Sequence, residues 1–131
     1  MRKSFAGLAA AATVAACLLT AAPPASAAGC VTSQLRTGLL GPGETARKAN
    51  SGCRDLNLTH TINTSSYNSD DYAGFYRDAF GYWTIGSRGY VHAYDGGHAL
   101  NEIVLVSNLS TGREFSVASK RDGQDQVEIT H

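Results

Sequence analysis

Apolar and polar side chains alternate with a period of two along most of the chain after Cys53, in short runs. No segment there repeats apolar residues at the i, i+3, i+4 spacing of an amphipathic helix. Because successive side chains of a strand point to opposite faces, these runs predict short β-strands with one buried face. The predicted strands are residues 56–62, 72–78, 83–85, 90–94, 103–106, 114–117 and 126–130.

Turn-forming residues separate these runs at regular intervals, at residues 86–89, 95–96, 108–112 and 122–123. Short strands joined by regular turns are typical of an antiparallel β-sandwich or a partly open small barrel. We therefore expect one all-β domain over residues 28–131. Residues 38–52 lack an apolar face and are expected to be strand or irregular. Residues 63–71 are predicted to form a mobile polar loop.

The first 27 residues have the pattern of a secretory signal peptide. Arg2 and Lys3 precede an Ala-rich apolar run over residues 5–22, and small residues at Ala25 and Ala27 form an A-x-A cleavage site. The run is short and ends in two prolines, which argues against a transmembrane anchor. Lipoprotein processing at Cys17 is a less favoured alternative, because it would bypass the A-x-A site. We expect a secreted, extracellular protein.

Removal of this segment leaves 104 residues with nine basic and eleven acidic side chains, a net charge of −2. That balance argues against nucleic-acid binding, and no membrane contact is expected after signal removal. Two cysteines remain, Cys30 and Cys53. In an exported protein they predict one disulfide, worth about 3 kcal/mol in the chain-entropy description.

The sequence lacks the common catalytic and cofactor motifs. The segment Gly86-Ser87-Arg88-Gly89 is not a nucleophile elbow, and there is no zinc-protease helix, dinucleotide loop or phosphate loop. The oxygens of Asn68, Asp70 and Asp71 lack the spacing of a calcium loop. His60 lies in an apolar stripe and is expected to be a hydrogen-bonded core or rim residue. We predict no enzymatic activity, no cofactor and no metal.

Three polar residues close in the sequence, His92, Asp95 and His98, support an alternative function, in which the protein is a metal-dependent enzyme or a small hydrolase. A two-residue turn at Asp95-Gly96 would put the two histidines on opposite faces of a hairpin. A three-residue turn over 95–97 would put them on one face, where a zinc or copper ion could bind with a third ligand. The Asp-Gly pair favours the two-residue turn.

Aromatic residues are concentrated in one part of the chain. Nine of the ten that follow the signal segment fall between Tyr67 and Tyr94. Tyr and Trp are enriched at recognition surfaces, because they combine a large contact area with a polar group. In the alternative interpretation, Phe75, Phe80 and Trp83 fill the core and the tyrosines lie at its rim. The candidate recognition residues are Tyr82, Trp83, Tyr90, His92 and Tyr94.

The first cysteine loop, with Gly29-Cys30-Val31-Thr32 and Ser51-Gly52-Cys53, resembles the opening of small secreted actinomycete inhibitors of α-amylase. The resemblance is confined to this loop, and it implies a disulfide-bonded β-sandwich. The family's inhibitory Trp-Arg-Tyr triplet is missing, and this chain has one candidate disulfide where the family has two.

Together these features predict a small secreted recognition protein whose partner is an extracellular protein or a polysaccharide. Inhibition of an extracellular hydrolase is the preferred version of this hypothesis. The alternatives are the enzyme based on His92 and His98 and a structural component of the cell envelope.

Overall fold

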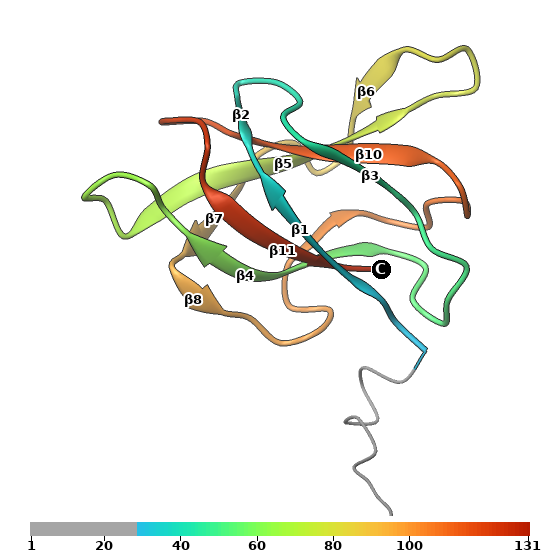
Figure 1. Ribbon diagram of the computed structural model, residues 1–131, viewed down its shortest axis with the longest axis horizontal. Coiled ribbons are helices and arrows are strands. Elements are labelled where there is room, and N and C mark those ends of the chain that lie inside the picture. Colours follow the sequence, from blue (N-terminus) through green and yellow to red (C-terminus); the bar gives the residue numbers. More distant parts are fainter. Residues whose placement is uncertain (1–28) are drawn as a thin grey trace, which may run out of the picture.

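The computed structural model describes residues 29–131, which form two packed β-sheets (Figure 1). The predicted signal segment, its cleavage site after Ala27 and Cys17 lie outside these residues. Within the described range there is no helix, and so none that could cross a membrane. The predicted all-β sandwich is confirmed, and the two sheets do not close into a barrel.

The first sheet is built around β11 and β4, with β1 on one side. Two short strands, β8 and β9, both pair with β4, and every pairing in this sheet is antiparallel. The strands of this sheet are β1 (Thr32–Arg36), β4 (Leu56–Ile62), β8 (Gly96–Gly97), β9 (Val104–Val106) and β11 (Gln126–Thr130).

The second sheet is built around β10 and β5, which pair over five residues. Strands β2 and β3 pair with β10, and β6 and β7 follow one another along the outer side of β5. The strands of this sheet are β2 (Gly38–Leu39), β3 (Thr45–Arg47), β5 (Ser69–Arg77), β6 (Trp83–Ile85), β7 (Val91–Tyr94) and β10 (Glu114–Ser119).

The core lies between the sheets and follows the alternation in the sequence. Phe115 and Val117 of β10 are fully buried, as is Tyr72 of β5. Gly74 allows the sheets to approach closely, because a Cβ atom there would lie 2.7 Å from Cγ2 of Val106. The other large buried residues include Leu56, Leu58, Leu105, Val127 and Ile129.

The predicted disulfide joins Cys30, just before β1, to Cys53, just before β4. The two Cα atoms are 5.3 Å apart, which is the usual separation for such a bond. The bond therefore ties the N-terminal strand to the segment that leads into the central strand of the first sheet. It supports an oxidising, extracellular environment.

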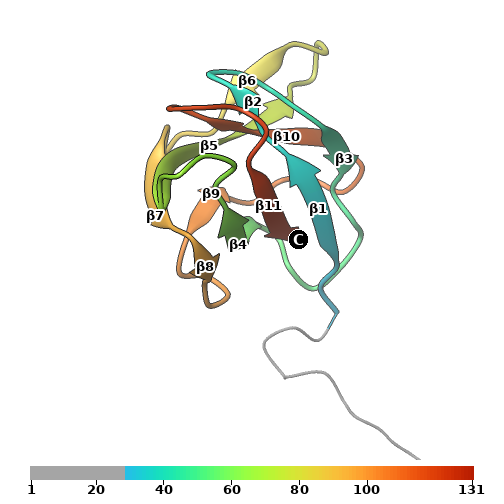
Figure 2. The same ribbon diagram turned by 60° about the vertical axis from the view of Figure 1, so that its left-hand side comes forward.

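Two local predictions are wrong. The polar loop is shorter than expected, because Ser69 to Asp71 already belong to β5, and Asn63 and Asp70 are buried. The hairpin predicted across Asp95-Gly96 does not form in either register. Strand β7 pairs with β5 and β8 pairs with β4, so the chain passes from one sheet to the other at Asp95. Figure 2 shows β7 and β8 in succession at that side of the sandwich.

Candidate functional site

The outer face of the second sheet carries most of the predicted recognition residues. Register places Trp83 opposite Arg77, and His92 opposite Asp71, on the face that points away from the buried Tyr72. Residues paired across antiparallel strands share a face. His92 and Tyr94 are accordingly exposed, whereas Ala93 between them is buried. The predicted alternation along β7 is confirmed.

Polar contacts hold several of these side chains. Nδ1 of His92 lies 2.7 Å from Oδ1 of Asp71, and its ring meets Tyr94 edge-on at 5.0 Å between ring centres. Tyr90 is half-buried, and its partial burial raises the pKa of the phenol. Nζ of Lys120 lies 5.9 Å from the centre of that ring. The surface is thus a mixed aromatic and charged one.

Among residues 29–131, the most exposed aromatic side chains lie on the hairpin between β5 and β6, residues 77–83, which extends beyond the body of the sandwich (Figure 1). Phe80 is 85% exposed and Tyr82 is 71% exposed. Trp83 is half-buried and lies on the outer face of the sheet. The alternative in which Phe80 and Trp83 fill the core is therefore wrong, and sequence reasoning missed Phe80 as a surface residue.

Asp78 fixes the shape of this hairpin. Its Oδ1 accepts hydrogen bonds from the backbone N–H of Phe80 at 2.8 Å and of Tyr82 at 2.9 Å. Its Oδ2 accepts a third, from Oγ1 of Thr84 at 3.3 Å. The backbone bond from Tyr82 N–H is the main reason that the pKa of Asp78 lies below its ordinary value. The carboxylate thus stays charged and keeps the turn in one conformation.

Arg77 braces the same hairpin from its outer side. Its Nε donates to Oε1 of Glu114 at 3.0 Å, and its Nη1 donates to the carbonyl oxygen of Gly81 at 2.9 Å. The guanidinium also lies over the ring of Trp83, 4.2 Å from the ring centre. The neighbouring side chains of Arg77 and Asp78 therefore hold the hairpin through hydrogen bonds, which leaves little conformational entropy for a partner to remove.

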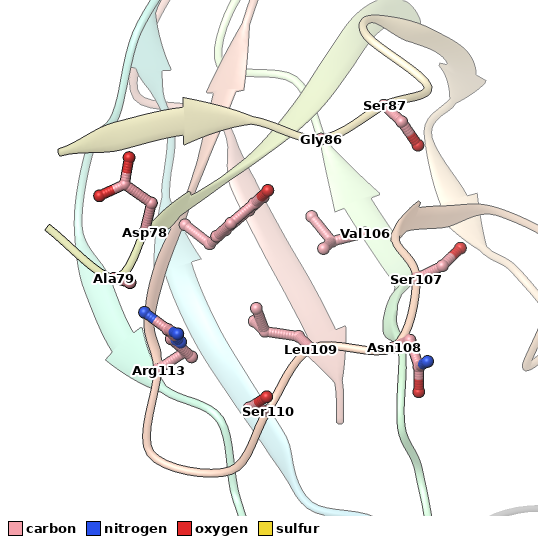
Figure 3. Close-up of a pocket in the computed structure, with 11 residues that line it drawn as sticks. Asp78, Ala79, Gly86, Ser87, Val106, Ser107, Asn108, Leu109, Ser110 and Arg113 are labelled. Atoms are coloured by element: carbon pink, nitrogen blue, oxygen red, sulfur yellow. The ribbon is translucent and has the colours of Figure 1, made fainter. Parts of the chain in front are cut away.

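A pocket of about 280 Å³ opens beside the base of the hairpin (Figure 3). Its lining includes Tyr76, residues 78–79 and residues 86–87. Residues 106–110 and Arg113 complete the lining. No sequence pattern marked this pocket, because its walls combine residues 76–87 around the hairpin with the later segment 106–113.

The two histidines of the enzyme alternative have separate surroundings. The side chain of His98 is only 9% exposed, and its Nε2 donates to the carbonyl oxygen of Tyr94 at 2.9 Å. Its Nδ1 lies 3.4 Å from Oε2 of Glu102. His92 instead contacts Asp71 on the outer face of the other sheet. The hairpin that would have brought the two imidazoles together is not formed.

Three carboxylates gather at another place. Single oxygens of Asp70, Asp122 and Asp125 lie within 4.8 Å of one another, and Asp70 and Asp125 are buried. Asp125 accepts hydrogen bonds from Tyr72 Oη at 2.9 Å and from Thr64. Burial raises the pKa of Asp125. Asp70 was expected beside Asn68 and Asp71 in a loop, but it anchors the 120–122 turn through the backbone N–H of Arg121.

Two other histidines have structural surroundings. His60 is half-buried in β4, in agreement with a rim position. His131 is buried, and its Nδ1 accepts a hydrogen bond from the backbone N–H of Ala49 at 3.0 Å. Its Nε2 lies 2.9 Å from Oγ of Ser33, and its ring meets Phe115 edge-on. Burial lowers the pKa of His131.

No known protein family, characterised protein or solved structure matches the chain. The resemblance of the first cysteine loop to α-amylase inhibitors thus extends no further than that loop. Function therefore has to be inferred from the geometry of this chain, in particular from the hairpin over residues 77–83.

Proposed function

We propose that this is a secreted, non-enzymatic recognition protein that inserts the hairpin over residues 77–83 into a cleft of an extracellular partner. The preferred partner is a secreted hydrolase, which the protein would inhibit by occupying its substrate cleft. One observation carries the proposal: Phe80 and Tyr82 are the two most exposed large hydrophobic side chains among the described residues, and both lie on this hairpin.

Exposed aromatic side chains in isolation are common, but these two have a rigid support. Asp78 and Arg77 hold the turn through hydrogen bonds to its backbone. A preorganised loop loses little entropy on binding, so its aromatic side chains can contribute most of their burial energy to affinity. The convex shape of the hairpin fits a concave partner, and a substrate cleft is the most common concave surface of a hydrolase.

The test is an inhibition assay on a panel of secreted hydrolases that act on starch, cell-wall polysaccharides and proteins. The mature wild-type protein is expected to inhibit at least one of them. Phe80→Ala is expected to weaken that inhibition by about thirtyfold or more, the effect of losing a central interface residue. Ile62→Ala is the matched control, because Ile62 is 47% exposed on β4 of the other sheet.

A panel in which no hydrolase is inhibited at micromolar protein would reject the inhibitor version. Equal inhibition by Phe80→Ala and wild type would reject the hairpin as the binding element. Circular dichroism of each variant separates these outcomes from a loss of folding.

The outer face of the second sheet favours a second candidate, binding of a polysaccharide. Trp83, His92 and Tyr94 share that face, and Tyr94 is 61% exposed. Sugar rings stack on such side chains. Depletion of the protein from solution by insoluble chitin, cellulose or xylan, abolished by Tyr94→Ala, would support it. Arg77 already covers one side of the Trp83 ring, so the hairpin remains the preferred element.

A further inference from the structure

The pocket beside the hairpin has an apolar floor. Val106 and Leu109 are buried, and both side chains point into the pocket that Arg113 also lines (Figure 3). Tyr76 adds a half-buried aromatic ring to the lining. With about 280 Å³, the pocket lies just below the usual range of small-molecule sites. It therefore fits a compact group rather than an extended ligand.

Arg113 is the cation of this pocket. Its side chain makes one hydrogen bond, from Nη1 to the carbonyl oxygen of Arg77 at 3.2 Å. Within residues 29–131, no carboxylate lies within ion-pair distance of it. Arg77 differs, because it is paired with Glu114 and stacked on Trp83. A guanidinium has five N–H donors, so most of those on Arg113 have no acceptor among the described residues.

Asp78, the acidic residue of the pocket lining, forms no ion pair with Arg113 within residues 29–131. The carboxylate of Asp78 accepts hydrogen bonds from Phe80 and Tyr82, and Figure 3 shows it turned away from Arg113. At the rim, the hydroxyls of Ser87 and Ser110 make no hydrogen bond within the described part of the chain. The pocket thus combines one unpaired planar cation, free hydroxyls and an apolar floor.

We propose that this pocket binds a carboxylate carried on a compact apolar body, with Arg113 as its anchor. The fork of a guanidinium matches the two oxygens of a carboxylate, and one guanidinium balances one negative charge. The apolar carbons of the ligand then lie on Val106 and Leu109. The binding of a carboxylate does not depend on the proposed function, but the molecule that supplies the carboxylate does. In a complex with the proposed partner, the carboxylate is that of a chain end or of an acidic side chain of the partner.

The test is a titration of the ¹⁵N-labelled mature protein, followed by NMR. N-acetyl-leucine supplies a chain-end carboxylate, and N-acetyl-glutamic acid α-amide supplies a side-chain carboxylate. N-acetyl-leucinamide is the neutral control. We expect saturable shifts at Ser107, Asn108 and the Arg113 side chain with at least one acid, with a Kd on the order of 1 mM. The acid that binds more tightly identifies the source.

Two variants make the test specific. Arg113→Gln is expected to weaken binding by about tenfold to a hundredfold, the usual effect of losing a charge-assisted hydrogen bond. Arg47→Gln is the matched control, because Arg47 is exposed and also donates one hydrogen bond, to the carbonyl oxygen of Gly112. It removes the same charge outside the pocket and is expected to leave binding unchanged.

Three results would overturn the inference. They are equal binding of N-acetyl-leucinamide, no saturable shift with either acid, and equal weakening by Arg47→Gln. The first two need only the wild-type protein, so they do not depend on the folding of a variant. Phe80→Ala separates this inference from the proposed function. Phe80 lies outside the pocket lining, so Phe80→Ala should weaken binding of the protein partner but leave binding of the N-acetylated acid unchanged.

Discussion

The carboxylate of Asp78 accepts a hydrogen bond of 2.8 Å from the backbone N–H of Phe80, the most exposed large hydrophobic residue among those described. A charged side chain therefore sets the position of the aromatic ring on which the proposed function depends. We expect Asp78→Ala to loosen the hairpin, with amide hydrogen exchange at Phe80 and Tyr82 about five- to tenfold faster. Asp78→Asn keeps one oxygen acceptor, so its exchange rates at these two amides should lie between those of wild type and Asp78→Ala. Unchanged exchange in both variants would show that the turn does not need this carboxylate.

The cation over Trp83 gives a spectroscopic prediction. Trp83 is half-buried with Arg77 across its ring, and it is the only tryptophan of the chain. Wild-type emission should lie between that of a buried indole and that of the denatured protein. Arg77→Gln should shift emission to the red and increase quenching by iodide, since it uncovers the ring. Arg88→Gln removes a charge from an exposed residue outside this contact and serves as the control. Identical spectra for all three proteins would contradict the contact.

The close packing of the sheets at Gly74 predicts a stability effect. A methyl group there would meet Val106 Cγ2 at 2.7 Å and Leu105 Cβ at 2.9 Å. Gly74→Ala should lower the free energy of unfolding by about 1–3 kcal/mol, the usual cost of overpacking. Urea unfolding measures this change. Gly97→Ala is the control, because the nearest atom to its added methyl group would be 3.9 Å away. Equal stability of the two variants would disprove the tight contact.

Burial of His131 predicts a pH effect on stability. The backbone N–H of Ala49 donates to Nδ1, so the fold holds the neutral imidazole, and burial lowers its pKa from 6.5. The contribution of His131 to stability is therefore complete above about pH 6.5. It falls as the pH drops from 6.5 toward the lower folded-state pKa.

Urea unfolding of wild type at about pH 7.5 and about pH 5 should show this loss of stability. In His131→Gln the difference between the two pH values should shrink. The other three histidines are present in both proteins, so the change isolates His131. The same pH dependence in wild type and variant would contradict this role.

Local patterns in the sequence predicted a substantial part of this fold. The alternation over residues 56–62 matches β4, in which Leu56 and Leu58 lie in the core, and residues 83–85 match β6. The even number of cysteines after the predicted signal segment indicated the Cys30–Cys53 disulfide. Strand β1 was not predicted, since Thr32 to Arg36 carries one buried apolar side chain, Leu35.

The hairpin at Asp95 and the pocket at Arg113 share a physical cause for the failed prediction, which is contact between parts of the chain that are distant in sequence. Asp95-Gly96 has the composition of a tight hairpin, but β7 finds its partner in β5 and β8 finds its partner in β4. Phe80 lies between Ala79 and Gly81 with no periodic pattern, so its exposure could not be predicted. The pocket around Arg113 combines residues 76–87 with the later segment 106–113, and no local signal marks it.

The proposed function requires Phe80 and Tyr82 to provide most of the binding energy for a protein partner. The most direct measurement is the dissociation rate of the complex with an inhibited hydrolase, by surface plasmon resonance, for wild type, Phe80→Ala, Tyr82→Ala and Ile62→Ala. Loss of an aromatic interface anchor acts mainly on dissociation. We expect dissociation to be about tenfold or more faster for each hairpin variant, with association within about threefold of wild type and no change for Ile62→Ala. Wild-type dissociation rates in both hairpin variants would contradict the proposed function.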